Sequence, residues 1–519
     1  MSVHHCSKPP RSKTLSLLVF SALLSVGCST IQPEPISDEA LVESSQTART
    51  TAAAGVEPIS TELSLDEAMA RALKYNLDRR ARLMEEALAH RQLDVAHFDM
   101  LPRVLAQAGY SWRDNDKTSL SRNPVTGEVS DIGFISQERQ HSISSLGASW
   151  NLLDFGVGYY NTRQQADRLL IAAEKRRKAM HLLMQDVRTA YWRALSAQKL
   201  QGDVRAATKM AEEALVDARQ AEAERLRNPV DALRYQRQLL ENLRLLEAID
   251  QELSTAHIDL AALINAPIGQ RLTLVEPATA VDRAALDLPV ALMEETAMAS
   301  NADVREQHYN ARIAREETRK TLVRLFPNLS FNYSVNYDTD SYLVNNRWNE
   351  AGIQLSFNLF NLFTGPAQMK MAEAGVALAD QRRLAVQMAT VTQVHLGRLQ
   401  MVHALNQFDR ADAIWEADRR ISEHVRNREA SMTQSKLDVV ANQTTAILSL
   451  LRRYQALSQA QAAEARLMST LGVEPVIGSV SELSLGDLTR DVSLRRNLWK
   501  GLAERAASPA VASDQAEAK

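Results

Sequence analysis

The sequence is poor in the residues that interrupt or cross-link a chain. Among 519 residues there are 18 glycines, 15 prolines and two cysteines, and aromatic residues make up 5%. A composition with few glycines and prolines and with abundant Ala, Leu, Gln, Glu and Arg is typical of long helices and coiled coils. Several compact domains, the usual expectation at this length, are therefore disfavoured, and two cysteines exclude a disulfide framework.

Charge of one sign and catalytic motifs are also missing. The net charge is -3, so no basic excess points to nucleic acid. No His-Glu-x-x-His motif, phosphate-binding glycine-rich loop or cysteine-based metal site is present. We therefore predict that the protein is not an enzyme, binds no metal or cofactor, and depends on a partner for any energy that export requires.

The N-terminus is predicted to be a targeting segment. Three basic residues precede an apolar stretch from Leu15 to Leu24, which is too short to span a bilayer in the mature protein. The following Ser25-Val26-Gly27-Cys28 resembles a bacterial lipobox. Residues 1–27 are thus predicted to be a lipoprotein signal peptide and Cys28 the lipidated first residue of a flexible or extended linker, 28–62. An ordinary secreted protein is the alternative.

The rest of the sequence is an internal duplication. Asn76, Asp78 and Pro102 recur 225 positions later, and Trp150-Asn151-Leu152-Leu153-Asp154 recurs 207 positions later as Phe357-Asn358-Leu359-Phe360-Asn361. A repeat of this size indicates a duplicated structural unit, with an 18-residue longer connection in the first copy. The predicted parts are a first repeat at 63–266, a linker at 267–286, a second repeat at 287–475 and a tail at 476–519.

Each repeat is predicted to contain two strands. A capping box at Ser64 begins a helix that should continue to about Met100, where Pro102 ends it. Beyond the corresponding Pro327, apolar Phe331, Tyr333, Val335 and Tyr337 alternate with polar residues. All four predicted strands are about ten residues long, enough for a tilted strand to cross a bilayer. Aromatic residues near the strand ends are expected at the membrane interface: Trp112, Trp150, Phe155, Tyr337, Phe357 and Phe360.

Four strands cannot close a barrel, and an open edge in lipid leaves backbone groups unpaired. Other copies must therefore supply strands: two copies would give a filled eight-stranded barrel, and three would give twelve strands and a passage. The connections around Asn123-Pro124 and Asn345-Asn346 would then be external loops. A pair of hairpins covering a soluble core is the alternative.

Very long helices follow the strands. Proline-free patterns with spacings of three and four predict helices from about Gly158 to Arg225 and from about Pro366 to the low 420s. Return helices are expected at Val230 to Ile264 and Leu437 to Leu471, and a short helix around Asp487 to Arg505. Helices this long must pack in a coiled coil or a helical tube.

Between about residues 63 and 475 the sequence resembles TolC-type outer-membrane efflux and secretion channels, most of all their lipidated multidrug-efflux branch. The resemblance rests on Leu63-Ser64-Leu65-Asp66-Glu67-Ala68 with Asn76, on the helix-Pro-strand junctions, and on Trp150 to Gly156. It implies a mainly α fold with β strands: a homotrimer with a twelve-stranded transmembrane barrel in the outer membrane of a Gram-negative bacterium, continued by a periplasmic helical barrel. Its implied partners are a periplasmic adaptor and an inner-membrane pump.

The resemblance also indicates candidate residues at the periplasmic tip. Asp231 and Asp438 match the acidic residues that line the family's entrance and would form rings of charge in a trimer; the alternative is that each caps a return helix. The family's usual glycine six positions earlier is replaced by Arg225 and Met432. The adaptor-contact candidates are Arg225, Asn228, Pro229, Met432 and Gln434.

The sequence thus predicts a passive exit duct of a tripartite efflux or type I secretion system. A lipid-anchored periplasmic coiled-coil protein without a pore is the alternative, although such a protein has no reason to alternate aromatics at bilayer length. A periplasmic adaptor is disfavoured because adaptors carry a single helical hairpin.

Overall fold

The computed structural model describes residues 33–59, 62–224, 228–270, 272–277, 283–430, 436–473, 480 and 482–494. The chain divides into two compact units, one up to Gly55 and one from Val56 onward. In the first unit, residues Asp38–Ala53 form helix α2, whose N-cap is Ser37. The prediction of a flexible or extended leader was therefore wrong for these residues, because a capping serine and an acidic first turn favour a helix there. The predicted signal peptide and Cys28 lie outside the described residues.

In the second unit, the helix predicted from Ser64 to Met100 is broken in two at Asn76. Its first part is α3, Leu65–Tyr75, and its second part is α4, Leu77–Phe98. The Asn76 side chain caps α4 by accepting a hydrogen bond from the Arg79 amide at 3.0 Å. Because that cap replaces the continuous helical hydrogen bonding, the prediction of one helix was wrong.

The first repeat contains four strands rather than two. The long strands are β1, Arg103–Trp112, and β4, Gln140–Asn151, and between them β2, Thr118–Arg122, pairs with β3, Val129–Ile135. The 18-residue longer connection was predicted only as a loop. It forms a hairpin because five-residue and seven-residue segments pair on either side of a turn at Asn123 to Gly127.

The long helices begin closer to the strands than predicted. Helix α5, Leu152–Ala223, starts directly after β4 and contains 72 residues, about 108 Å at 1.5 Å per residue. Helix α9, Asn361–Ala430, includes Pro366 as its sixth residue, where proline removes one backbone hydrogen bond of the helix. The return helices are α6, Pro229–Leu263, and α10, Lys436–Leu471. The remaining elements are the short helix η1, Ala284–Asp287, α7, Val290–Ser300, α8, Ala302–Arg324, β5, Asn328–Asp338, β6, Arg347–Ser356, and α11, Leu485–Leu494.

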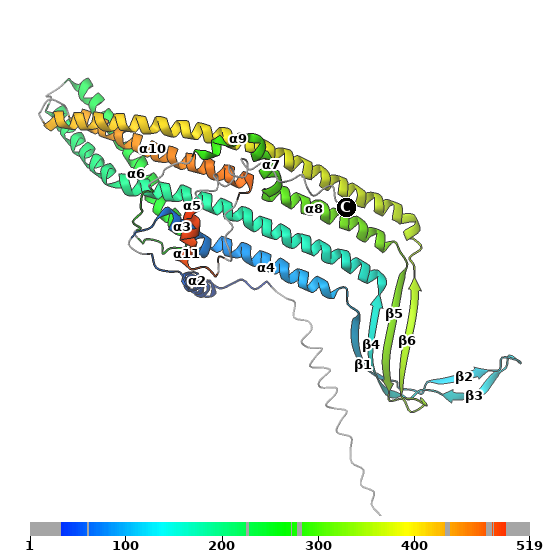
Figure 1. Cartoon of the computed structure of the whole chain (residues 1–519). Coiled ribbons are helices and arrows are strands. Elements are labelled where there is room, and N and C mark those ends of the chain that lie inside the picture. Colours follow the sequence, from blue (N-terminus) through cyan, green and yellow to red (C-terminus); the bar gives the residue numbers. More distant parts are fainter. Residues whose placement is uncertain are drawn as a thin grey trace, which may run out of the picture. The chain divides into compact units, whose positions relative to one another are not determined.

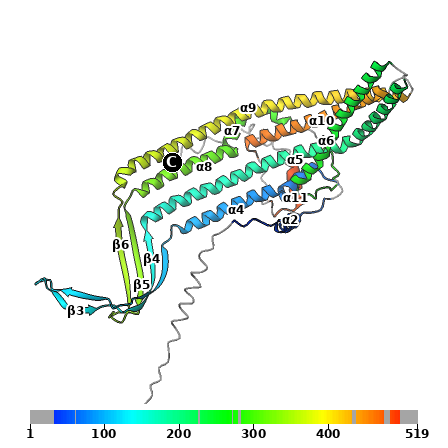
Figure 2. The same cartoon turned by 180° about the vertical axis from the view of Figure 1, so that it is seen from behind.

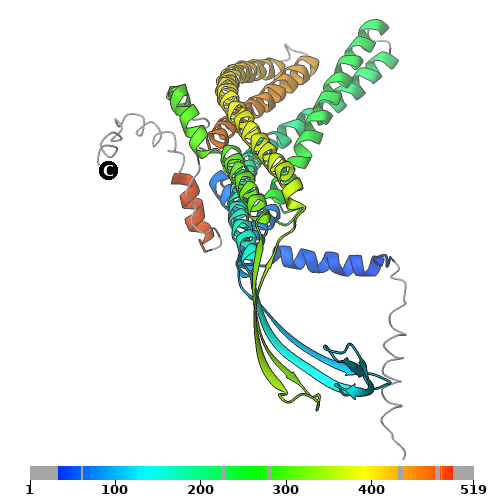
Figure 3. The same cartoon turned by 90° about the vertical axis from the view of Figure 1, so that its right-hand side faces the viewer.

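The strands and the helices that extend them follow the same spatial order. The four-stranded antiparallel sheet has the order β1-β4-β5-β6. The helices joined to these strands pack as α4 on α5, α5 on α8, and α8 on α9, as Figures 1 and 2 show. The sheet continues from one end of this helical layer and curves along its length in Figure 3. We call the sheet, together with the layer formed by α4, α5, α8 and α9, the wall. Elements β1 and α4 form one edge of the wall, and β6 and α9 form the other.

The duplication is preserved in tertiary contacts. The Asn76 side-chain amide donates to the Leu263 carbonyl at 3.0 Å, and its counterpart Asn301 donates to the Thr470 carbonyl at 2.9 Å. Leu263 and Thr470 are themselves 207 positions apart. Each asparagine thus joins the start of the helix that leads to the sheet, α4 or α8, to the end of the return helix of its own repeat, α6 or α10.

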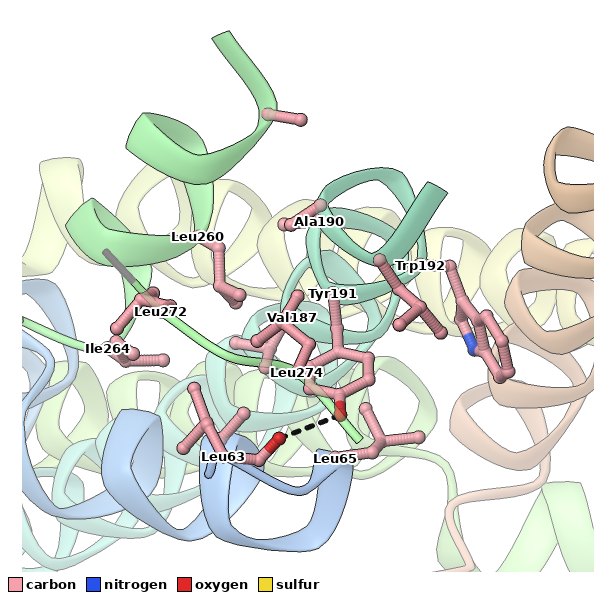
Figure 4. Packing of buried hydrophobic residues seen from close by; sticks show 14 of the residues in the cluster. Leu63, Leu65, Val187, Ala190, Tyr191, Trp192, Leu260, Ile264, Leu272 and Leu274 are labelled. Carbon is pink, nitrogen blue, oxygen red and sulfur yellow. Dashed lines mark hydrogen bonds between the residues drawn. The ribbon is translucent and has the colours of Figure 1, made fainter. Parts of the chain in front are cut away.

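The largest buried cluster surrounds the middle of α5. Figure 4 shows Tyr191 among Leu63, Val187 and Leu274. The Tyr191 hydroxyl lies 2.9 Å from the Leu63 carbonyl and 2.6 Å from the Val275 carbonyl, and its burial raises the pKa of the phenol. This core joins the start of the first repeat to the linker between the repeats. None of the helices formed by the described residues is both long and apolar enough to span a membrane.

Candidate functional site: sheet wall and helical tip

The strand register places apolar side chains from all four long strands on one face of the sheet. Directly opposed residues in antiparallel strands share a face; Trp150 lies opposite Phe331, which lies opposite Ile353. On β1, Ala106 lies opposite Leu146 of the same face. One face is therefore suited to lipid and the other to water. The second face carries mostly small or polar residues, among them Gln107, Ser145, Ser149, Asn332, Asn336 and Gln354, and its large apolar side chains are Leu105, Ile143 and Trp348.

The six predicted interface aromatics lie at the two ends of the sheet. At the helical end, the Trp150 ring meets the Phe155 ring edge-on at 5.8 Å between centroids, and lies 6.3 Å from that of Phe331. Phe357 and Phe360 follow β6 rather than belonging to it, because the strand ends at Ser356. The helical end thus holds Trp150, Phe155, Phe357 and Phe360, and the distal end holds Trp112 and Tyr337.

Both edges of the sheet are unpaired and exposed in the single chain. Every residue of β1 and β6 is exposed, and within the described part of the chain neither strand pairs on its outer side. Val104 and Ile353, on the apolar face, expose 70% and 72% of their surface. An apolar face of this extent marks an interaction or membrane surface.

The distal end of the sheet is held by a polar cluster that the sequence analysis missed. The Nδ1 atom of His141, at the start of β4, lies 2.9 Å from the Asp338 carboxylate at the end of β5, and both side chains are buried. The amide of Gln137 contacts the other ring nitrogen at 2.9 Å, and Asp340 accepts from the Glu138 amide at 3.2 Å. These contacts join the connections that follow β3 and β5. The residues are about 200 positions apart, so no local sequence signal indicates them.

At the tip of the first helical hairpin, α6 is capped by Asn228 rather than by aspartate. The Asn228 side chain accepts from the Val230 amide at 3.0 Å, and Pro229 occupies the first turn of α6. Asp231 also lies in this turn, exposed and 3.7 Å from Arg234, so the alternative that it caps α6 was wrong. Asp438 lies in the first turn of α10 and is half-buried. Arg225, Met432 and Gln434 lie outside the described residues.

A charged contact joins the two repeats inside the chain. Arg312 of α8 donates to both carboxylate oxygens of buried Asp167 on α5, at 2.8 and 2.9 Å from Nε, and this pairing raises the pKa of the guanidinium. Along the same helices, Lys320 donates to Gln164 at 3.0 Å. Further down, Arg305 pairs with Glu174 at 2.8 Å. We call α5 with α8, together with β4 with β5, the internal seam.

Within the described residues, no group of three or more His, Cys, Asp or Glu side chains is arranged to hold a metal ion. The geometry is that of a wall with one apolar and one polar face.

Known proteins share this architecture. Residues 68–266 match the family model of outer membrane efflux proteins. This match lies within the first repeat. The family is one of channels, so the predictions of an outer membrane efflux channel and of a protein that is not an enzyme are confirmed.

Solved structures of low sequence identity share the fold over most of the chain. A membrane protein from Pseudomonas aeruginosa is 16% identical, with a TM-score of 0.58 over 81% of this chain and 92% of that one. The CmeC outer membrane channel of Campylobacter jejuni is 13% identical, with a TM-score of 0.60 over 83% and 89%. The open state of the Neisseria gonorrhoeae MtrE outer membrane channel is 18% identical, with a TM-score of 0.58 over 79% and 88%. No curated protein matches the sequence.

Proposed function

We propose that three copies of this outer-membrane efflux channel close into a twelve-stranded barrel, continued by a helical tube in the periplasm. The observation that supports this proposal is the sheet, with one apolar face, one polar face and two free edges. Because β1 and β6 run in opposite directions, β6 of one copy can pair antiparallel with β1 of the next. Eight strands from two copies would leave an interior filled by side chains, whereas twelve leave a passage.

The proposed location of the protein is the outer membrane of a Gram-negative bacterium. Removal of residues 1–27 would leave Cys28 to carry the lipid, and residues 28–62 would link it to the first repeat. The aromatic residues at both ends of the sheet would lie at the two membrane interfaces.

The proposed partners are a periplasmic adaptor and an inner-membrane pump of an efflux or type I secretion system. They would supply the energy, because the chain has no nucleotide-binding or catalytic motif. Arg225, Asn228, Pro229, Met432 and Gln434 would meet the adaptor at the tip. Asp231 and Asp438 would each form a ring of three charges at the entrance, attracting cations and resisting closure unless they are screened.

Labelling of adjacent cysteines on the central strand β5 tests the barrel. Tyr333 belongs to the apolar face and Ser334 to the polar face. In intact outer membranes, a small membrane-impermeant maleimide should label Ser334→Cys from the lumen and leave Tyr333→Cys unlabelled, with the parent chain as the background control. Equal labelling of both variants by this reagent would contradict a barrel and favour a periplasmic coiled-coil protein.

A further inference from the structure

Two helices meet end to end between α5 and α9. Helix α10 ends at Leu471 and α8 begins at Ala302, and both pack against α5 and α9, as Figure 1 shows. The Asn301 side chain joins them, because it donates to the Thr470 carbonyl and accepts from the first amides of α8. These backbone groups are therefore paired within the chain.

A cavity of about 430 Å³ lies beside this junction. It is lined by residues of α5, α8, α9 and α10, among them Leu182 and Leu396, which each expose 50% of their surface. Binding sites for small organic molecules have volumes in this range.

The cavity opens on the face of the helical layer that lies away from α7. Gln393 of α9 lines the cavity, whereas His395 of the same helix contacts Glu294 of α7 at 2.7 Å. Two residues of a helix that are two positions apart point about 200° apart around its axis. Helix α7 therefore packs on the opposite side of α9 and leaves the cavity uncovered.

Basic side chains predominate in the lining. Arg177 and Lys178 of α5 and Arg466 of α10 are the basic residues, and Asp303 of α8 is the acidic one. Three positive charges against one negative charge give the lining a formal charge of +2.

Arg177 is committed to contacts within the chain. Its guanidinium donates to Glu174, outside the lining, at 2.6 Å and to the carbonyls of Ser300 and Gly472 at 2.7 and 3.2 Å. Glu174 balances its charge, so Arg177 holds the junction together.

Lys178 and Arg466 supply the charge that a ligand can reach. Lys178 pairs with Asp303 at 2.8 Å, but the two side chains expose 50% and 40% of their surface, and so exposed a pair contributes little to stability. Arg466 is exposed and contacts the uncharged amide of Gln400 at 3.4 Å, which is long for a hydrogen bond.

The fold does not require basic residues at such a junction. The equivalent junction of the first repeat joins the end of α6 to the start of α4 through Asn76. The Gln400–Arg466 contact becomes Arg193–Asp259 there, an ion pair at 3.0 Å. The counterparts of the three basic residues, 207 positions away and in the same order, are Leu384, Ala385 and Asp259.

We infer that the cavity binds a small organic anion. A carboxylate or phosphate group accepts charge-assisted hydrogen bonds from Lys178 and Arg466, and the apolar part of the molecule lies against Leu182 and Leu396. The site is formed within one chain, so the inference goes beyond the proposed function and does not require the trimer.

Fluorescence anisotropy of fluorescein, a rigid aromatic carboxylate, tests this site. The purified full chain would be placed in nanodiscs of zwitterionic lipid, and empty nanodiscs would give the background. Rhodamine 123, which has the same three-ring skeleton but a positive charge, is the matched probe. Fluorescein should bind saturably and about tenfold more tightly than rhodamine 123, because only the anion forms charge-assisted hydrogen bonds with the lining.

Substitutions separate the cavity from general charge. Arg466→Gln should weaken fluorescein binding about fivefold, because one charge-assisted hydrogen bond is lost. Ser469→Leu keeps every charge but fills part of the cavity, so it should weaken binding as well. Lys209→Gln removes an exposed charge of α5 outside the cavity and should leave binding unchanged.

Thermal unfolding of each variant would show that it is folded. Equal affinity of the parent chain and a folded Arg466→Gln variant, or equal binding of the two dyes, would overturn the site. A chain that runs as a monomer in mild detergent and still binds fluorescein would overturn the proposed trimer and leave the site intact.

Discussion

The two longest helices, α5 and α9, are counterparts in the two repeats, but they have different surroundings. Helix α5 packs against α4, α6, α8 and α10, whereas α9 lies at the edge of the wall. Trp192 of α5 is buried and donates from its indole to Gln461 at 2.6 Å; its counterpart Leu399 exposes 53% of its surface. The two helices therefore share a backbone conformation, but α5 buries at this position a side chain where α9 exposes one.

The largest expected effect follows from replacing the two counterparts in turn. Trp192→Ala should lower the free energy of unfolding by about 3–5 kcal/mol, because it leaves a cavity in the core and removes the hydrogen bond from the indole to Gln461. Leu399→Ala should change folding stability by less than about 1 kcal/mol and should instead lower the fraction of trimer on dilution. Denaturant titration of each detergent-solubilised variant would measure the stability, and native mass measurements would measure the fraction of trimer. Equal losses of stability in the two variants would contradict the difference between α5 and α9.

The Lys320–Gln164 pair has the counterparts Val95 of α4 and Met371 of α9, which the proposed trimer would bring together between copies. Val95→Lys should weaken association by tenfold or more, because it buries an ammonium group opposite Met371. Adding Met371→Gln rebuilds the Lys320–Gln164 pair of the internal seam and should restore much of the association.

Trimer content would be measured against protein concentration, with Val125→Lys at the exposed hairpin turn as the control. If Met371→Gln fails to restore the association of a folded Val95→Lys chain, Val95 and Met371 do not meet between copies as Lys320 and Gln164 meet within one chain.

The asparagines should behave alike in both repeats. Asn76→Ala and Asn301→Ala each remove a helix cap and the hydrogen bond to a return helix. Each should lower the stability by about 1–2 kcal/mol. A loss confined to one of the two variants in thermal unfolding would show that the repeats differ in their cores as well as at their edges.

The smallest effects are expected at the tip. Asn228→Ala should cost about 1 kcal/mol because α6 loses its cap. Asp231→Asn, at an exposed position, should change stability by less than about 0.5 kcal/mol but lower the preference for cations in bilayer conductance. An unchanged preference would place Asp231 away from the passage.

The elements with strong periodicity could be predicted from the sequence, and those fixed by distant partners could not. Alternation in Phe331 to Tyr337 predicted β5, and the lack of proline between Gly158 and Ala223 predicted most of α5. The break at Asn76 was missed because an asparagine is tolerated within a helix, and its cap is reinforced by Leu263, 187 positions away. The His141–Asp338 contact could not be predicted for the same reason, because the two residues are 197 positions apart in the sequence.

The β2–β3 hairpin, in contrast, had a local signal. Its turn contains Asn123, Pro124 and Gly127, and Gly127 has a φ of +77°, a conformation that favours glycine. Short alternating segments flank this turn, so turn chemistry could have identified the hairpin. The tip remains the least predictable region, since Arg225, Met432 and Gln434 stay candidates from resemblance alone.

We propose that several copies, each with two free edges, make one passage. The most direct measurement is the native mass of the full chain extracted from outer membranes in mild detergent. We expect a trimer, which supplies twelve strands and closes every edge. A monomer that leaves the membrane without detergent, either as the parent chain or as Cys28→Ala, would contradict a barrel made by several copies.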